Sequence, residues 1–131
     1  MSAESMVKIK QIVPGICKGR LLLLERYVSF FGEVDPESGC LREENICISN
    51  VVLAFKGTRG STVAPYIIYA LKKNGKNPIC MLVEEAEPML IAGCVVAEIP
   101  LYAVEDLSKL RGFAGCHVKV VGDTLKVECS E

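Results

Sequence analysis

Residues 51–83 decide the fold class, and they read VVLAFKGTRGSTVAPYIIYALKKNGKNPICMLV. The run ICISNVVLAF (46–55), which leads into this stretch, is apolar and rich in β-branched residues, as is typical of a strand buried on both faces. A second apolar run lies within residues 77–85. A glycine-containing loop and a helical segment separate the two runs, so the stretch predicts a strand–loop–helix–strand unit.

The helical segment of this unit has signals at both of its ends. Proline suits the first helical position, and the residue before a proline is biased away from helical angles, so we expect the helix to begin at Pro65. Lys72 and Lys73 in the last turn complement the helix dipole. Gly75 suits the position that follows the helix, because glycine adopts a positive φ without strain.

The flanking segments favour strands. Outside the central unit we expect strands at residues 7–13 and 99–103, strand residues at Tyr27, Val28, Phe30 and Phe31, a turn at residues 35–39, a short apolar helix or turn at residues 87–97, and a hairpin at residues 117–128. Strands that alternate with a helix in the centre and are framed by antiparallel elements predict a mixed sheet. We therefore expect one α/β domain over residues 1–131.

Composition excludes several classes of protein. The 131 residues are 50% apolar and carry a net charge of −1, so the chain lacks the low hydrophobicity and high charge of a disordered protein. A general nucleic-acid binder would show a basic excess, which is missing. No apolar run is long enough to span a membrane. The first 15 residues contain no apolar stretch like that of a signal peptide, so we expect a cytoplasmic location.

The cysteines predict reduced structural thiols rather than a metal site. Their number is odd and none are in C-x-x-C spacing. Cys80 and Cys94 lie inside apolar runs, where cysteine usually behaves as a small buried hydrophobe. One or two disulfides remain open for a chain from a hyperthermophile. The seven are Cys17, Cys40, Cys47, Cys80, Cys94, Cys116 and Cys129.

The loop from Phe55 to Thr62, FKGTRGST, is the candidate for chemistry. It joins a predicted strand to a predicted helix, an arrangement in which backbone N–H groups and the helix N-terminus favour an anion. Lys56 and Arg59 add positive charge, and arginine can bind a carboxylate or phosphate through two hydrogen bonds. The loop matches neither the phosphate-binding G-x-x-x-x-G-K-[ST] motif nor the nucleophile elbow G-x-S-x-G. The structural alternative is that Ser61 only caps the helix.

Three other residues favour structural interpretations. His117 is the only histidine, so it cannot form a histidine metal site within this chain, and its place in an alternating strand is typical of a surface residue. Tyr66 and Tyr69 at the start of the predicted helix are interpreted as packing residues.

Four segments together resemble one known family, the aconitase X swivel domain. The resemblance covers residues 19–128, and its order and spacing are more specific than the loop alone. The matching segments are FFGEVDPESGCL (30–41), VLAFKGTRGSTVAPYIIYALKKNGKNP (52–78), EPMLIAGCVVAEIPLY (87–102) and GDTLKVE (122–128).

This resemblance implies a swivelling β/β/α domain with a mixed sheet, made as a separate small subunit of a hydro-lyase. The implied activity is dehydration of (R)-5-phosphomevalonate to trans-anhydromevalonate 5-phosphate, in the archaeal modified mevalonate pathway of isoprenoid biosynthesis. A large catalytic subunit is the implied partner, in a heterodimer or higher assembly. The cofactor is an iron–sulfur cluster expected in that large subunit, with none in this chain. Neither a nucleic-acid nor a membrane partner is expected.

The site residues follow from the same resemblance. The family's proton-accepting serine falls on Ser61, and Arg59, Gly60, Thr62 and Lys56 are the expected substrate-binding residues. Removal of water from a β-hydroxy acid needs a base at carbon 2, and a serine base works only if its alkoxide is stabilised. Loop N–H groups and an adjacent arginine can supply that stabilisation. The chain departs from the family pattern at Thr58 and at Ala64-Pro65, which bears on the shape of the loop.

Two alternatives remain open at this point. The chain can be the small subunit of another aconitase X-type dehydratase, such as one acting on cis-3-hydroxy-L-proline. It can also be a non-catalytic swivel module that binds anions. The complete Arg59-Gly60-Ser61 sequence favours an enzyme, and we expect no activity without the large subunit.

Overall fold

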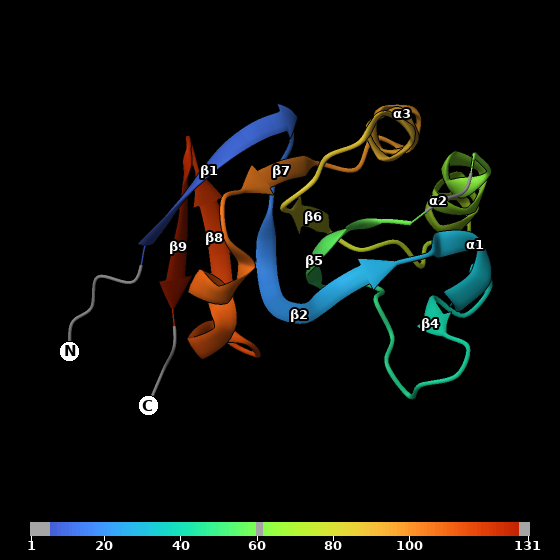
Figure 1. The fold of residues 1–131 in the computed structure, drawn as a ribbon, viewed down its shortest axis with the longest axis horizontal. Helices are drawn as coiled ribbons and strands as arrows, with labels where there is room; N and C mark the ends of the chain where they lie inside the picture. The colour runs from blue at the N-terminus through green and yellow to red at the C-terminus, as the bar shows by residue number, and fades with distance from the viewer. Residues whose placement is uncertain (1–5, 60–61, 129–131) are drawn as a thin grey trace.

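The computed structural model describes residues 6–59 and 62–128 and shows a closed, mixed barrel with helices on one side (Figure 1). The order of the barrel strands is β1-β7-β6-β5-β2-β8-β9, and β3 and β4 form a separate two-stranded sheet. In chain order the elements are β1 (Met6–Val13), β2 (Lys18–Val28), α1 (Phe30–Glu33), β3 (Val34–Asp35), β4 (Cys40–Leu41), β5 (Val52–Thr58), α2 (Ala64–Lys73), β6 (Cys80–Val83), α3 (Pro88–Ala97), β7 (Leu101–Val104), the 3-10 helix η1 (Leu107–Phe113), β8 (His117–Val121) and β9 (Thr124–Glu128).

The parallel part of the barrel determines where a site can lie. Strands β2, β5, β6 and β7 run parallel to one another, so their carboxyl ends share one edge. Helices α1, α2 and α3 each begin within a few residues of that edge, after β2, β5 and β6. The remaining pairings, made by β1, β8 and β9, are antiparallel. The expected α/β fold with a mixed sheet is therefore confirmed.

Two apolar clusters lie on the two faces of the parallel strands. Along β5, Leu53 and Phe55 join the cluster beneath the helices, whereas Val52 and Ala54 join a second cluster with η1 and the β8–β9 hairpin. Successive strand residues point to opposite faces, which explains why this run shows no polar alternation. Figure 1 shows the same division, with the helices on one side of the strands and the hairpin on the other.

Helices α2 and α3 pack closely because a glycine lies between them. A Cβ at Gly93 would lie 2.9 Å from Ile68 Cδ1 and 3.1 Å from Pro65 Cα. A larger residue at this position would push the helices apart. The two helices therefore present one continuous outer surface.

Three sequence predictions about the elements need correction. Phe30 and Phe31 lie in the short helix α1 rather than in a strand, because the Ser29 side chain accepts a hydrogen bond from the Gly32 N–H and begins a helical turn. The strand predicted at residues 46–55 begins only at Val52, since Asn50 has a φ of 57° and interrupts extended backbone. At its other end this strand runs on to Thr58.

The helix and hairpin predictions are confirmed more closely. Helix α2 begins at Ala64, one residue before the predicted start, and Gly75 has the expected positive φ of 70°. The apolar stretch at residues 87–97 forms α3, and β8 and β9 form the terminal hairpin. The predicted strand at residues 99–103 lies instead at Leu101–Val104.

The expectation of reduced thiols is wrong for five of the six described cysteines: the four named next and Cys116, which is also disulfide-bonded. Cys17 is bonded to Cys80 although 63 positions separate them, because the start of β2 lies next to β6 across the barrel interior. Cys40 is bonded to Cys47 across an isolated β-bridge. Cys94 is a free, buried thiol, as predicted. In the described part of the chain, no helix has the length and apolar character to cross a membrane.

Candidate functional site

Three strand-to-helix junctions meet at the carboxyl edge of the parallel strands. They are the β2–α1, β5–α2 and β6–α3 junctions. In α/β folds with parallel strands, in open sheets and in closed barrels alike, ligands bind at the carboxyl ends of the strands. The three junctions therefore define the candidate site, and they differ in how each helix N-terminus is satisfied.

The β2–α1 junction is closed by its own side chains. The Glu33 carboxylate accepts a hydrogen bond from the Ser29 N–H at 2.8 Å and pairs with Arg26 at 2.7 Å. Burial alone would raise the pKa of the Glu33 carboxyl, but these two partners outweigh burial and hold that pKa below its ordinary value. Arg26 is also paired with Glu44 at 3.0 Å. These charges already have partners.

The β6–α3 junction is closed in the same way. The Glu87 carboxylate accepts hydrogen bonds from the N–H groups of Met89 and Leu90, each at 3.1 Å, and so caps α3. The Thr58 hydroxyl at the end of β5 donates a hydrogen bond to the same carboxylate. A carboxylate therefore already occupies the position in which a helix N-terminus would hold an anion.

The β5–α2 junction carries an arginine instead. The Arg59 N–H donates to the carbonyl of Val28 at 3.2 Å, which fixes the start of the loop against β2. The Arg59 guanidinium carbon lies 5.1 Å from the centre of the Tyr27 ring, and the residue is exposed. Within residues 6–59 and 62–128, no carboxylate forms an ion pair with Arg59. Its donors are available to an external anion.

The sequence-predicted site residues are distributed around this junction. Arg59 lies directly after β5, and exposed Thr62 lies in the turn before α2. Gly60 and Ser61 lie between them in the sequence and outside the described residues. Pro65 within the first turn of α2 has no N–H to offer a ligand.

Lys56 has a different neighbour from Arg59. It lies inside β5, and its ammonium is 3.7 Å from a Glu84 carboxylate oxygen. The other oxygen of Glu84 accepts the Leu107 N–H of η1 at 2.7 Å. The structure therefore places the two predicted anion-binding cations against separate partners. The substrate-binding role of Lys56 stays a prediction.

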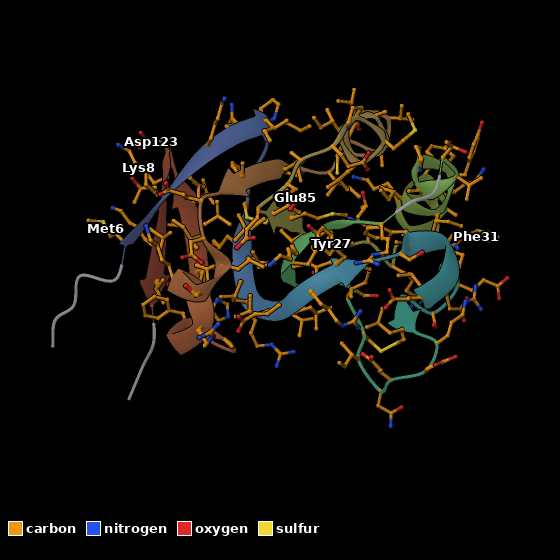
Figure 2. The ribbon with its side chains drawn as sticks, in the orientation of Figure 1. Met6, Lys8, Tyr27, Phe31, Glu85 and Asp123 are labelled. Atoms are coloured by element: carbon orange, nitrogen blue, oxygen red, sulfur yellow. A yellow bond between two sulfur atoms is a disulfide. The ribbon has the colours of Figure 1, made fainter. Side chains whose placement is uncertain are left out.

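Sequence reasoning missed two residues of the site, Tyr27 and Glu85. The Tyr27 hydroxyl donates to the Glu85 carboxylate at 2.5 Å, and this hydrogen bond raises the pKa of Tyr27. Figure 2 shows both side chains near the middle of the molecule, where β2, β5 and β6 are neighbours. The only sequence signal was position, since Tyr27 lies near the end of one predicted strand and Glu85 lies two residues after the apolar run that ends at Val83.

The described cysteines do not fit an iron–sulfur cluster. Five are disulfide-bonded, and burial raises the pKa of the Cys94 thiol to about 12, which disfavours the thiolate that a metal needs. No group of three or more His, Cys, Asp or Glu side chains in the described part of the chain is arranged to hold a metal ion.

An apolar surface adjoins the β5–α2 junction. Pro65, Tyr66, Tyr69 and Val96 line a surface hollow of about 460 Å³ on α2 and α3. Tyr66 is 73% exposed and Val96 is 63% exposed. The interpretation of Tyr66 and Tyr69 as packing residues is therefore wrong, because both point away from the core of this chain. We call these four residues the α2–α3 surface.

The known proteins that are similar to this chain include aconitase X and small subunits of phosphomevalonate dehydratase. The aconitase X swivel domain family matches residues 6–129. The phosphomevalonate dehydratase small subunit of Thermococcus onnurineus is 42% identical over 95% of this chain and 98% of its own length. The subunit of the same name from Pyrococcus abyssi is 39% identical over 93% and 96%. A crystal structure of Thermococcus kodakaraensis aconitase X in its holo form gives a TM-score of 0.85 at 36% identity, over 94% of this chain and 98% of that chain.

Proposed function

The chain belongs to the aconitase X swivel domain family, and from this membership we infer that it is the small subunit of a two-subunit hydro-lyase. The names of the relatives give the substrate as a phosphomevalonate. The proposed reaction is dehydration of (R)-5-phosphomevalonate to trans-anhydromevalonate 5-phosphate. The observation that carries this proposal is an exposed arginine that has no carboxylate partner among residues 6–59 and 62–128. It lies at the one of the three junctions that no carboxylate of these residues closes.

The proposed base is Ser61, two residues after Arg59. Dehydration moves the proton of carbon 2 to the serine alkoxide oxygen, and the C–H electrons form the double bond to carbon 3. The C–O bond at carbon 3 breaks with its electrons on oxygen, and the departing hydroxide takes up a proton from solvent to give water. The serine must act as an alkoxide, so positive charge beside it is required. Arg59 supplies that charge, because the arginine side chain is a cation with five N–H donors.

Arg59 also suits the anionic substrate. Phosphomevalonate carries a carboxylate and a phosphate, and guanidinium binds either through two parallel hydrogen bonds. Exposed Thr62 lies on the other side of the loop and is the proposed second polar contact. An iron–sulfur cluster in the large subunit would supply a Lewis acid for the leaving hydroxyl. The remaining chemistry assigned to this chain is proton removal and anion binding.

The α2–α3 surface is the proposed seat of the large subunit. It begins three residues after Thr62, so a partner that covers it also reaches the loop. Helix α3 carries no charged residue from Pro88 to Ala97, yet Val95 and Val96 are exposed. A helix that is apolar all round is normally covered. Aromatic residues at the centre of such a surface are typical of protein interfaces.

The function is tested by mixing this chain with the cluster-loaded large subunit. We expect loss of 5-phosphomevalonate only when both subunits are present, and no reaction of cis-3-hydroxy-L-proline. Turnover by the chain alone would contradict the proposal. If the mixture dehydrates cis-3-hydroxy-L-proline but not 5-phosphomevalonate, the chain is instead the small subunit of a hydroxyproline dehydratase.

The docking surface is tested in the same mixture. Tyr66→Asp should weaken large-subunit binding on the order of tenfold, because a central aromatic contact is lost. Val121→Asp is the control, since Val121 is also exposed but lies on the β8–β9 hairpin. Equal affinities for the two variants would exclude the α2–α3 surface.

A further inference from the structure

We propose that Tyr27 is a positioning residue that holds the Arg59 guanidinium at the mouth of the β5–α2 loop, with Glu85 fixing the ring. This inference rests on the proposed function, in which Arg59 binds the substrate. Tyr27 itself is not assigned a substrate contact, because its hydroxyl hydrogen is already donated to Glu85.

A shift in the pairing register between β2 and β5 determines the position of the Tyr27 ring. Leu24 pairs with Phe55, but three residues later Tyr27 pairs with Gly57, only two residues on. Regular pairing would place Arg26 opposite Gly57. The extra residue in β2 shifts the register in the manner of a β-bulge, a feature that redirects side chains next to active sites. It brings an aromatic ring, rather than a second cation, beside the end of β5.

Gly57 leaves room for the backbone of Glu85, and the Tyr27 ring lies beside it. A Cβ at this position would lie 3.0 Å from the carbonyl oxygen of Glu85 and 3.5 Å from Cε1 of Tyr27. The ring and the chain after β6 therefore lie close against the β5 backbone. With the hydrogen bond to Glu85 at 2.5 Å, the ring is fixed at its hydroxyl end and supported along its edge.

Arg59 is held at two points. Its N–H is bonded to the Val28 carbonyl, and its guanidinium lies 5.1 Å from the centre of the Tyr27 ring. None of the ion pairs among the described residues involves this guanidinium, so its donors remain available. An exposed contact of this kind changes an equilibrium about two- to fivefold. Tyr27 thus lowers the entropic cost of orienting Arg59 toward an anion.

A double-mutant cycle in the two-subunit enzyme separates positioning from general structure. Tyr27→Leu should lower kcat/KM for 5-phosphomevalonate about two- to fivefold. In an Arg59→Ala background the same change should have no effect, because there is no guanidinium left to orient. Tyr27→Phe keeps the ring and should retain most of the activity. Phe31→Leu, which removes an exposed ring on α1 (Figure 2), should leave kcat/KM unchanged in both backgrounds.

Proton NMR of the full chain supplies a readout independent of activity. The ring current of Tyr27 should shift the Arg59 side-chain protons upfield. Tyr27→Leu should abolish this shift, and Tyr27→Phe should preserve it. Glu85→Gln should lower the pKa of the Tyr27 hydroxyl, because the carboxylate that raises it is removed.

The outcomes distinguish this inference from the proposed function. An Arg59→Ala enzyme with wild-type kcat/KM would overturn the proposed function, whatever the NMR result. Suppose instead that Arg59→Ala lowers kcat/KM, and that Tyr27→Leu lowers it by the same factor in the wild-type and Arg59→Ala backgrounds. That result would overturn the positioning role of Tyr27 and leave the proposed function standing. Arg59 proton shifts that do not respond to Tyr27→Leu would overturn it as well.

Discussion

The β5–α2 and β6–α3 junctions are neighbours on one sheet edge, yet their helices begin in different ways. At β6–α3, Glu87 caps the helix with its own carboxylate and accepts the Thr58 hydroxyl. At β5–α2, the capping position is Val63, which has no carboxylate, and exposed Arg59 precedes the helix. One junction holds an internal anion, and the other carries an exposed cation.

In this account the difference distinguishes a junction that stabilises the fold from a junction that takes part in binding and catalysis. An internal carboxylate stabilises a helix N-terminus at all times but excludes a second anion from it. The β2–α1 junction, closed by Glu33, follows the β6–α3 pattern. The β5–α2 junction is the exception, and in this account its chemistry belongs to binding and catalysis. Variants at the three junctions should therefore affect different quantities.

The largest expected effect is on turnover at Ser61. Ser61→Ala should slow dehydration by the two-subunit enzyme on the order of 100- to 10,000-fold, because a general base is removed. The free energy of unfolding should change by about 1 kcal/mol at most, as for the loss of a helix cap. Ser108→Ala, which removes an exposed hydroxyl on η1, is the control for kcat. Near wild-type turnover of Ser61→Ala would assign the base to another group.

The next effect is on substrate binding at Arg59. Arg59→Ala should lower kcat/KM about 10- to 150-fold, since a hydrogen bond to a charged group contributes about 1.5–3 kcal/mol. Arg59→Lys should recover only part of the loss, because an ammonium cannot form two parallel hydrogen bonds. Arg20→Ala, at an exposed position early in β2, is the control. Full activity of Arg59→Lys would mean that charge alone suffices.

The opposite pattern is expected at Glu87. Glu87→Ala should lower the free energy of unfolding by about 0.5–2 kcal/mol, because α3 loses its cap. Urea titration measures this change, and kcat/KM of the folded variant should fall less than for Arg59→Ala. Glu105→Ala removes an exposed carboxylate and should leave stability near wild type. If Glu87→Ala left stability intact and abolished activity, the junction would be chemical rather than structural.

The smallest effect concerns pH and Glu33. The pKa of this carboxyl is lower in the folded chain than its ordinary value of 4.5. The unfolded chain therefore binds more protons there, and the stabilisation is complete above the ordinary pKa and lost as pH falls through the folded one. Glu33→Gln should flatten the acid side of the stability profile measured by urea titration. An unchanged acid slope would show that Glu33 contributes nothing to it.

Much of the fold could be predicted because its signals are local. The β5–α2–β6 unit carries two buried runs and a helix with Pro65 at its start and Gly75 after its end. The β8–β9 hairpin has alternating strands on either side of Gly122. Arg59 could be selected as a candidate because it follows a strand and precedes a helix. Each of these inferences needs only neighbours in sequence.

What the sequence did not reveal depends on tertiary neighbours. Tyr27 meets Gly57 only through the register shift in β2, and no periodicity signals such a shift. Cys17 and Cys80 meet only when the barrel closes. Lys56 was grouped with Arg59 because both lie in the same short loop sequence. The strand continues through Lys56, however, and gives it Glu84 as its partner.

The most direct test of the account follows the proton itself. The two-subunit enzyme is allowed to equilibrate 5-phosphomevalonate with its dehydrated product in deuterium oxide, and deuterium at carbon 2 of the recovered substrate is measured. The account predicts that wild type and Ser108→Ala incorporate deuterium at the same rate. It also predicts that Ser61→Ala loses incorporation by the same factor as turnover. Deuterium incorporation by Ser61→Ala at the wild-type rate would contradict the assignment of proton transfer to the β5–α2 junction.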